Sequence, residues 1–165
     1  MIVAIGERAD ASLWSDGVTE KAAIAWAKDP LKAMLAEEAC PIGSVERSRL
    51  GHLTGVHPDL CINLLPPAPR GEAWDAVQAQ VHADLLVAWG VTEEARFLLL
   101  GKKIMRAFRI HASIQLGAMR LEREVPMLFL PSPSGPARAE GRPSKREQIL
   151  RWVRAFVAQY GKGQE

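Results

Sequence analysis

Two carboxylates lie directly after the first apolar run of the chain. Met1–Ile5 is short and rich in β-branched residues, which predicts a buried strand, and Gly6 permits a sharp turn after it. Glu7 and Asp10 occupy the loop that follows. A carboxylate at a strand end can orient a water molecule or stabilise a developing cation. The segment Gly6–Asp10 is therefore the first candidate for chemistry, and a capped, solvated loop is the alternative.

Two further polar features accompany predicted strands. Asn63 lies in the otherwise apolar segment Asp59–Leu65, and a buried asparagine needs hydrogen-bond partners. It can pair with the edge of a base, or it can tie down the proline-rich loop that follows. The loop Leu130–Gly135 carries the hydroxyls of Ser132 and Ser134 between prolines. Such a loop can hold a phosphate, although a plain tight connection also fits the sequence.

Basic residues are concentrated in two stretches, although the net charge of the chain is only +2. Lys102–Arg109 contains four cations, and Arg138–Arg154 contains six cations and two carboxylates. Surfaces of this kind bind phosphates, or they are simply solvated helix faces. The four histidines and two cysteines lack metal-ligand spacing, so we expect no metal and no other cofactor.

The elements expected to position these residues alternate between strands and helices. This alternation predicts an α/β protein in which a central four-stranded parallel sheet lies between helices, a three-layer α/β/α arrangement. We expect a single domain over residues 1–165, with about 161–165 as a loose tail. The predicted strands are 1–5, 59–65, 97–100 and 125–130, and the predicted helices are 19–27, one from Pro30, 44–53, 73–88, 102–108 and 144–160.

Two of these helices carry apolar stripes that should face the core. The stripe on the helix over 73–88 is Trp74, Val77, Val81, Leu85 and Ala88. The stripe on the helix over 144–160 is Ile149, Val153, Phe156 and Val157.

Ligands of open α/β sheets bind at the carboxyl edge of the strands. We therefore expect a pocket where the loops Gly6–Asp10 and Ser132–Gly135 meet. The chain shows no leader pattern and no apolar run of about 20 residues, so no membrane association is expected. The cysteine usage favours a reducing compartment, the cytoplasm. We expect a monomer.

Taken in order, these segments resemble the uracil-DNA glycosylase superfamily. The family's first loop, of the type Gly-Glu-Ala-Pro-Gly or Gly-Gln-Asp-Pro, is matched by Gly6–Asp10. Its base-reading asparagine at the end of the second strand is matched by Asn63. Its strand–glycine–helix segment is matched by Leu99–Phe108, and its terminal His-Pro-Ser loop by Leu130–Gly135. The resemblance covers nearly the whole chain.

This resemblance implies a DNA-binding hydrolase that cleaves the N-glycosidic bond of a damaged or modified base flipped out of the stack. It implies a first-loop group that handles the water and a second-loop donor for the departing base. The implied catalytic residues are Glu7, Asp10 and Ser132, the base-binding residues are Gly6, Arg8 and Asn63, and the DNA-binding residues are Lys102, Pro133, Ser134, Gly135, Arg138 and Arg142.

The chain departs from the family pattern at three positions. Ala9 replaces the first-loop proline, Arg8 replaces the usual acid or amide, and Ser132 replaces the histidine. A neutral serine stabilises a departing anion less than an imidazole does. Two alternatives therefore stay open: a protein that binds nucleic acid or a modified base without cleaving it, and a transferase that acts on a modified base or nucleotide.

Overall fold

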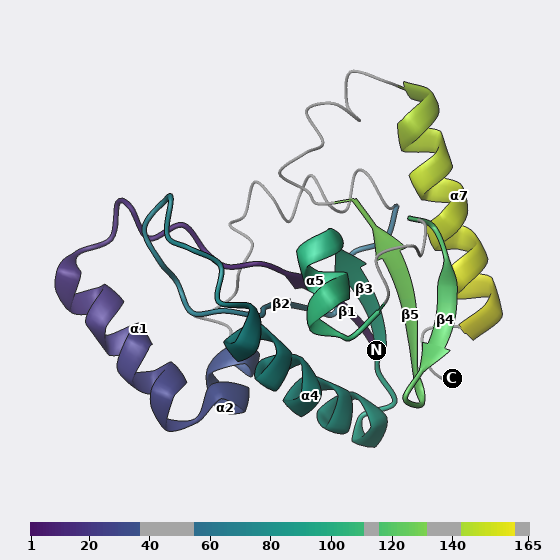
Figure 1. Ribbon diagram of the computed structural model, residues 1–165. Helices are drawn as coiled ribbons and strands as arrows, with labels where there is room; N and C mark the ends of the chain where they lie inside the picture. Colours follow the sequence, from purple (N-terminus) through teal and green to yellow (C-terminus); the bar gives the residue numbers. More distant parts are fainter. Residues whose placement is uncertain (37–54, 111–115, 132–142, 161–165) are drawn as a thin grey trace.

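Short apolar segments form the sheet at the centre of the molecule, in a computed structural model that describes residues 1–36, 55–110, 116–131 and 143–160. Four strands are parallel to their neighbours: β1 (Ile2–Gly6), β2 (Leu60–Asn63), β3 (Arg96–Leu100) and β5 (Val125–Leu130). A fifth strand, β4 (Met119–Glu122), pairs antiparallel with β5 at the edge, giving the order β2-β1-β3-β5-β4 (Figure 1). The α/β class and the four predicted strands are confirmed, whereas the prediction of a four-stranded, wholly parallel sheet is wrong.

The additional strand is joined to β5 by a turn without the usual sequence signal. Glu122 pairs with Val125, so only Arg123 and Glu124 connect the strands. Both residues have positive φ angles, 48° and 71°, as in a type I′ turn. Such turns favour Asn-Gly or Asp-Gly, and their absence explains why β4 was not predicted from the sequence.

Helices cover both faces of the sheet. The helices α2 (Pro30–Leu35), α4 (Ala76–Thr92) and α5 (Lys102–Ala107) pack on one face, around a core that includes Val3, Ile62 and Phe97. The helix α1 (Asp16–Lys28) packs against α2 and adds Trp26 to this core. The helix α7 (Pro143–Tyr160) packs on the opposite face, where the predicted residues Ile149, Val153 and Phe156 are buried and Val157 is partly buried. Within the described residues no helix combines the length and apolar character that crossing a membrane requires.

The predicted inner stripe of α4 lies largely on its outer face. Val77, Val81 and Leu85 are exposed, Ala88 is exposed, and Trp74 precedes the helix. The buried face combines small and larger residues, and at Gly90 the helix lies so close to the sheet that a Cβ would be 2.7 Å from the Phe97 ring. The buried positions of α4 are Ala79, His82, Ala83, Leu86, Val87 and Gly90. The stripe prediction was wrong because apolar side chains recur on both faces of this helix, so their spacing does not mark the buried face.

Candidate functional site

The ends of β1 and β2 bring the first loop next to Asn63. Gly6 stands opposite Asn63 in the parallel register, and a Cβ at Gly6 would lie 3.5 Å from Asn63 Oδ1. The two segments stay paired beyond the ends of β1 and β2, since Leu64 N donates to the Gly6 carbonyl at 3.0 Å and Leu65 N donates to the Glu7 carbonyl at 3.0 Å. The predicted residues Gly6, Glu7 and Asn63 therefore lie together at the carboxyl edge of the sheet.

Asn63 is buried with an unsatisfied amide. Its side chain is 2 % exposed, and Nδ2 has no hydrogen-bond partner in the described part of the chain. Leaving a buried donor unsatisfied costs about 1–3 kcal/mol, so such a group in a native protein calls for an explanation. A ligand acceptor brought to Nδ2 would recover that free energy.

Glu7 lies between the first loop and α5. Its Oε1 atom is 3.5 Å from Lys103 Nζ, and the Glu7 side chain is 33 % exposed. The same ammonium lies 5.6 Å from the ring centroid of Trp74. Exposed ion pairs contribute about 0.2–1 kcal/mol and exposed cation–π contacts about 0.5–1 kcal/mol. Lys103 is therefore held weakly by both partners and can exchange them for a ligand.

Asp10, the second predicted carboxylate, is engaged in local structure. Its Oδ1 atom accepts hydrogen bonds from Ser12 N at 2.9 Å and from Ser12 Oγ at 2.5 Å. Its Oδ2 atom lies 3.4 Å from Arg70 Nε. These Ser12 hydrogen bonds, with the Arg70 charge as a smaller cause, lower the pKa of Asp10. The arrangement holds the first loop against the proline-rich loop, so Glu7 is the carboxylate of this loop that remains for chemistry.

Arg8 also connects the two loops. Its guanidinium donates to the backbone carbonyl of Ala73 at 3.2 Å and to that of Glu72. Ala68 N donates to the Ala9 carbonyl at 3.2 Å and extends the pairing. In this structure Arg8 positions the segment that leads to Trp74, which is a different task from the base contact expected of it.

His82 supports the strand that carries Asn63. The ring is 2 % exposed, and Nδ1 lies 2.6 Å from the carbonyl oxygen of Leu64, the residue after Asn63. Because a carbonyl can only accept, Nδ1 carries the proton. The His82 ring also packs against Trp26, with 5.4 Å between ring centroids. His82 thus anchors the end of β2 to α4.

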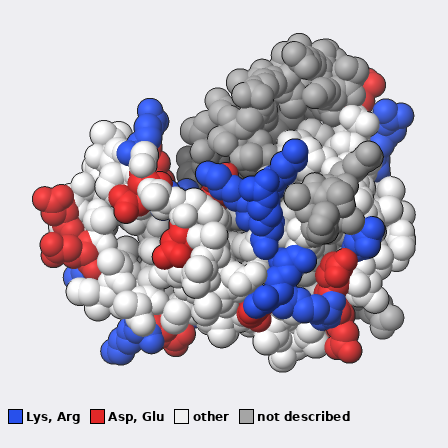
Figure 2. Space-filling model, viewed as in Figure 1, with Lys and Arg blue, Asp and Glu red and all other residues white. Residues whose placement is uncertain are grey.

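Cations form a patch over α5. Lys102, Lys103 and Arg106 are exposed on this helix, and Figure 2 shows their positive charge in the middle of the face. Arg109 follows the helix and is engaged elsewhere, since Nη2 lies 3.0 Å from Asp84 Oδ2. We call Lys102, Lys103 and Arg106 the α5 patch. It includes Lys102, which was predicted to bind DNA, and adjoins Glu7 through Lys103.

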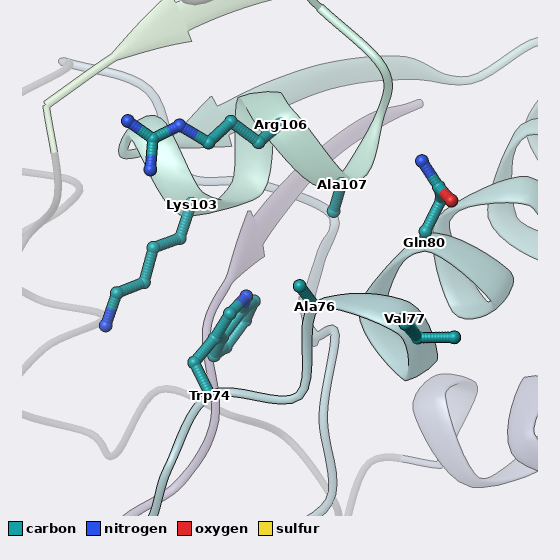
Figure 3. A pocket seen from close by; sticks show the side chains of 7 residues that line it. All are labelled: Trp74, Ala76, Val77, Gln80, Lys103, Arg106 and Ala107. Atoms are coloured by element: carbon teal, nitrogen blue, oxygen red, sulfur yellow. The ribbon is translucent and has the colours of Figure 1, made fainter.

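A hollow of about 260 Å³ lies between α4 and α5 beside this patch. Trp74, Val77 and Gln80 form one side of it, and Lys103 and Arg106 form the other (Figure 3). A larger hollow of about 580 Å³ lies between α1 and α2 and has Trp14, Trp26 and Lys21 in its wall. Among the described residues, none of the predicted site residues lines either hollow. The smaller hollow has Lys103 in its wall, and Lys103 also contacts Glu7, so we assign the site to the smaller one.

The other predicted site residues lie outside the described part of the chain. They include the second loop, and the expected meeting of that loop with Gly6–Asp10 is outside it too. These residues are Ser132, Pro133, Ser134, Gly135, Arg138 and Arg142.

Three site residues were not predicted to take part: Trp74, Gln80 and Lys103. The sequence places Trp74 in a predicted core stripe, and it places Lys103 in the basic stretch Lys102–Arg109. Two features of the sequence could have indicated them: Trp74 directly before the helix cap Asp75, and the Gly-Lys-Lys turn after β3 that contains Lys103.

Among the described residues no group of three His, Cys, Asp or Glu side chains is arranged to hold a metal ion. Comparison of the chain with protein-family models, with curated proteins and with solved structures finds no match.

Proposed function

We propose that the carboxyl edge at Gly6, Glu7 and Asn63 recognises a damaged or modified base flipped out of DNA and hydrolyses its N-glycosidic bond. The chain would then be a divergent member of the uracil-DNA glycosylase superfamily. Water would add at C1′ of the sugar, the bond from C1′ to the base nitrogen would break, and the bonding electrons would leave with the base. The proton lost by the water would pass to the carboxylate or to the departing base.

The observation that carries this proposal is the unpartnered amide of Asn63. A buried Nδ2 at the carboxyl end of β2, beside the first loop, is a hydrogen-bond donor that no described residue of the chain satisfies. A carbonyl oxygen on a base edge would accept from it, and the interaction would strengthen as the base gains negative charge on leaving.

Glu7 supplies the carboxylate that this reaction needs. It follows the residue paired with Asn63, and Asp10 is engaged by Ser12 and Arg70. A carboxylate at this position would orient the water and stabilise the cation-like sugar. Lys102 and Arg106 of the α5 patch would bind backbone phosphates, and Ser132 and Ser134 remain the proposed donors of the second loop.

A second candidate function, binding of a modified base without hydrolysis, is favoured by the contact between Glu7 and Lys103. With its Oε1 atom 3.5 Å from the ammonium, the carboxylate already has a partner, and this contact competes with its use on a water molecule. In such a protein Glu7 would keep Lys103 oriented toward a bound strand.

Incubation of the purified protein with labelled oligonucleotides separates the two candidates. Each oligonucleotide carries uracil, hypoxanthine, xanthine or 5-hydroxymethyluracil, and alkali then cleaves any abasic site. Cleavage at one base establishes hydrolysis and identifies the substrate. A salt-sensitive gel shift without cleavage supports the binding protein. The absence of both signals would contradict the two candidates together.

A further inference from the structure

We infer that Trp74 is a stacking platform for an unpaired nucleobase, and that Lys103 and Arg106 bind the phosphate of the same strand. The ligand is single-stranded nucleic acid that runs across the hollow between α4 and α5. This inference rests on the proposed function, because it identifies the strand in which the target base is presented.

The Trp74 ring is held in place by the elements around it. Asp75 caps α4, with Oδ1 accepting from Gln78 N at 3.0 Å, and Trp74 is the residue just before this cap. Its ring is partly buried and packs against the core, while its remaining surface lines the hollow (Figure 3). A partly exposed aromatic ring with a fixed orientation loses little freedom when a base stacks on it.

The wall of the hollow matches the parts of a nucleotide. Trp74 offers an aromatic face, Gln80 offers an amide for a base edge, and Lys103 and Arg106 offer cations for a phosphate. The volume of about 260 Å³ lies just below the range of about 300–1,000 Å³ typical of small-molecule pockets. It suits one base with its phosphate at the rim better than a larger ligand.

Other aromatic residues are less suited to this role. Phe97 is fully buried under Gly90, and Trp26 is buried against His82. Trp14 lines the larger hollow, away from the α5 patch. Trp74 is the aromatic residue in the wall of the smaller hollow, and Lys103 connects it to Glu7.

The aromatic platform selects a single strand. In a duplex each base is covered on both faces by its neighbours, whereas an unpaired base has a free face for an aromatic side chain. A base on Trp74 and a phosphate at Lys103 would replace the two weak contacts of that ammonium, with the Trp74 ring and with Glu7. Binding of the strand would then release Glu7 for the water, which links this surface to the proposed chemistry.

Fluorescence anisotropy of a fluorescein-labelled, unmodified dT12 oligonucleotide tests the inference on the full chain. Trp74→Leu removes the aromatic face and keeps apolar contact with the core. We expect it to weaken dT12 binding about tenfold, as the loss of one stacked base does. Trp74→Phe should bind within about threefold of the wild type, and so should Trp89→Leu, the matched control at a partly buried Trp within α4.

The charge of Lys103 has its own signature. Lys103→Met should reduce the slope of log Kd against log salt concentration by about 0.7, the value for one phosphate contact on a single strand. Lys32→Met, at an exposed lysine of α2, should leave the slope unchanged. Equal slopes for Lys103→Met and the wild type would overturn the phosphate contact.

Competition experiments distinguish a single strand from a free nucleotide and from a duplex as the ligand of this surface. If dTMP displaces dT12 at the same molar concentration as unlabelled dT12, the ligand is a free nucleotide and the strand is overturned. If a 12-base-pair duplex binds as tightly as dT12, or if Trp74→Leu and Trp89→Leu behave alike, the platform is overturned. Failure of the proposed hydrolysis is recognised separately, since base release can be absent while Trp74 still governs dT12 binding.

Discussion

Asn63 and His82 are the two buried polar residues of the described chain, each 2 % exposed, and they are used differently. Asn63 is the last residue of β2, and His82, which lies on α4, contacts the Leu64 carbonyl just after it. His82 Nδ1 has a hydrogen-bond partner, whereas Asn63 Nδ2 has none among the described residues. A satisfied buried group contributes to the fold, and an unsatisfied one costs stability unless a ligand completes it. We therefore assign His82 to the support of the site and Asn63 to ligand binding.

The same contrast extends to the carboxylates of the first loop and gives the largest expected effect. Glu7→Gln should lower the rate of base release by about 10²-fold or more, because the residue that handles the water is lost. Asp10→Asn is the matched control, since Asp10 is engaged by Ser12 and Arg70, and it should retain the rate within a few-fold. Single-turnover cleavage at saturating protein measures both. Equal losses in the two variants would contradict the division of roles.

Replacement of Asn63 should separate activity from stability. Asn63→Leu should lower base release about 10- to 100-fold, by removing a hydrogen bond of about 1–3 kcal/mol to the base. Its free energy of unfolding should equal or exceed that of the wild type, because the unsatisfied amide is gone. Urea unfolding followed by circular dichroism measures the second quantity. A variant destabilised by several kcal/mol would mean that Asn63 serves the fold.

Replacement of His82 should show the opposite pattern. His82→Leu leaves the Leu64 carbonyl without its partner and should reduce the free energy of unfolding by about 1–3 kcal/mol. At a temperature where the variant is folded, dT12 binding should change little, because His82 is buried and its hydrogen bond is to the Leu64 carbonyl. Loss of dT12 binding by a fully folded variant would count against a supporting role.

The smallest expected effect is a pH dependence at acidic carboxyls. Hydrogen bonds from Ser12 lower the pKa of Asp10, and those from Arg109 and then Arg123 lower the pKa of Asp84. A lowered folded-state pKa means that the stabilisation is present above the ordinary value of 3.8 and is lost as the pH falls through the folded-state pKa.

The double variant Asp10→Asn, Asp84→Asn should therefore be less stable than the wild type at pH 7, and the difference should shrink below about pH 4. Urea midpoints at pH 7 and pH 3 measure this difference. If the urea midpoints of the double variant and the wild type differ equally at pH 7 and pH 3, the two carboxylates do not stabilise the fold through their charge.

The sequence predicted the parallel strands and the position of the first loop, because short apolar runs that end in glycine or proline reflect local preferences. It did not predict β4, because the turn at Arg123 and Glu124 needs positive φ angles and these residue types do not favour them. It assigned the wrong face of α4, because apolar residues lie on both faces of that helix and their spacing does not mark the buried one.

The candidate site was predicted in part for the same reason. Gly6, Glu7 and Asn63 come together because parallel strands end at one edge, which follows from chain order alone. The separate tasks of Glu7 and Asp10 depend on Ser12, Arg70 and Lys103, whose side-chain positions are set by tertiary packing. The place of Trp74 beside Lys103 likewise depends on how α4 and α5 meet, and no spacing in the sequence reports that.

Asn63 is the single asparagine in the sequence, which allows one direct measurement of the central claim. Labelling the protein with asparagine that carries ¹⁵N in its side-chain amide gives one pair of NH₂ signals, those of Nδ2. Oligonucleotides with uracil, hypoxanthine, xanthine or 5-hydroxymethyluracil are then added to saturation. We predict that one of them shifts this pair as Nδ2 gains an acceptor, while unmodified dT12 does not. An unmoved signal with all four bound oligonucleotides would contradict the assignment of Asn63 as the residue that reads the base.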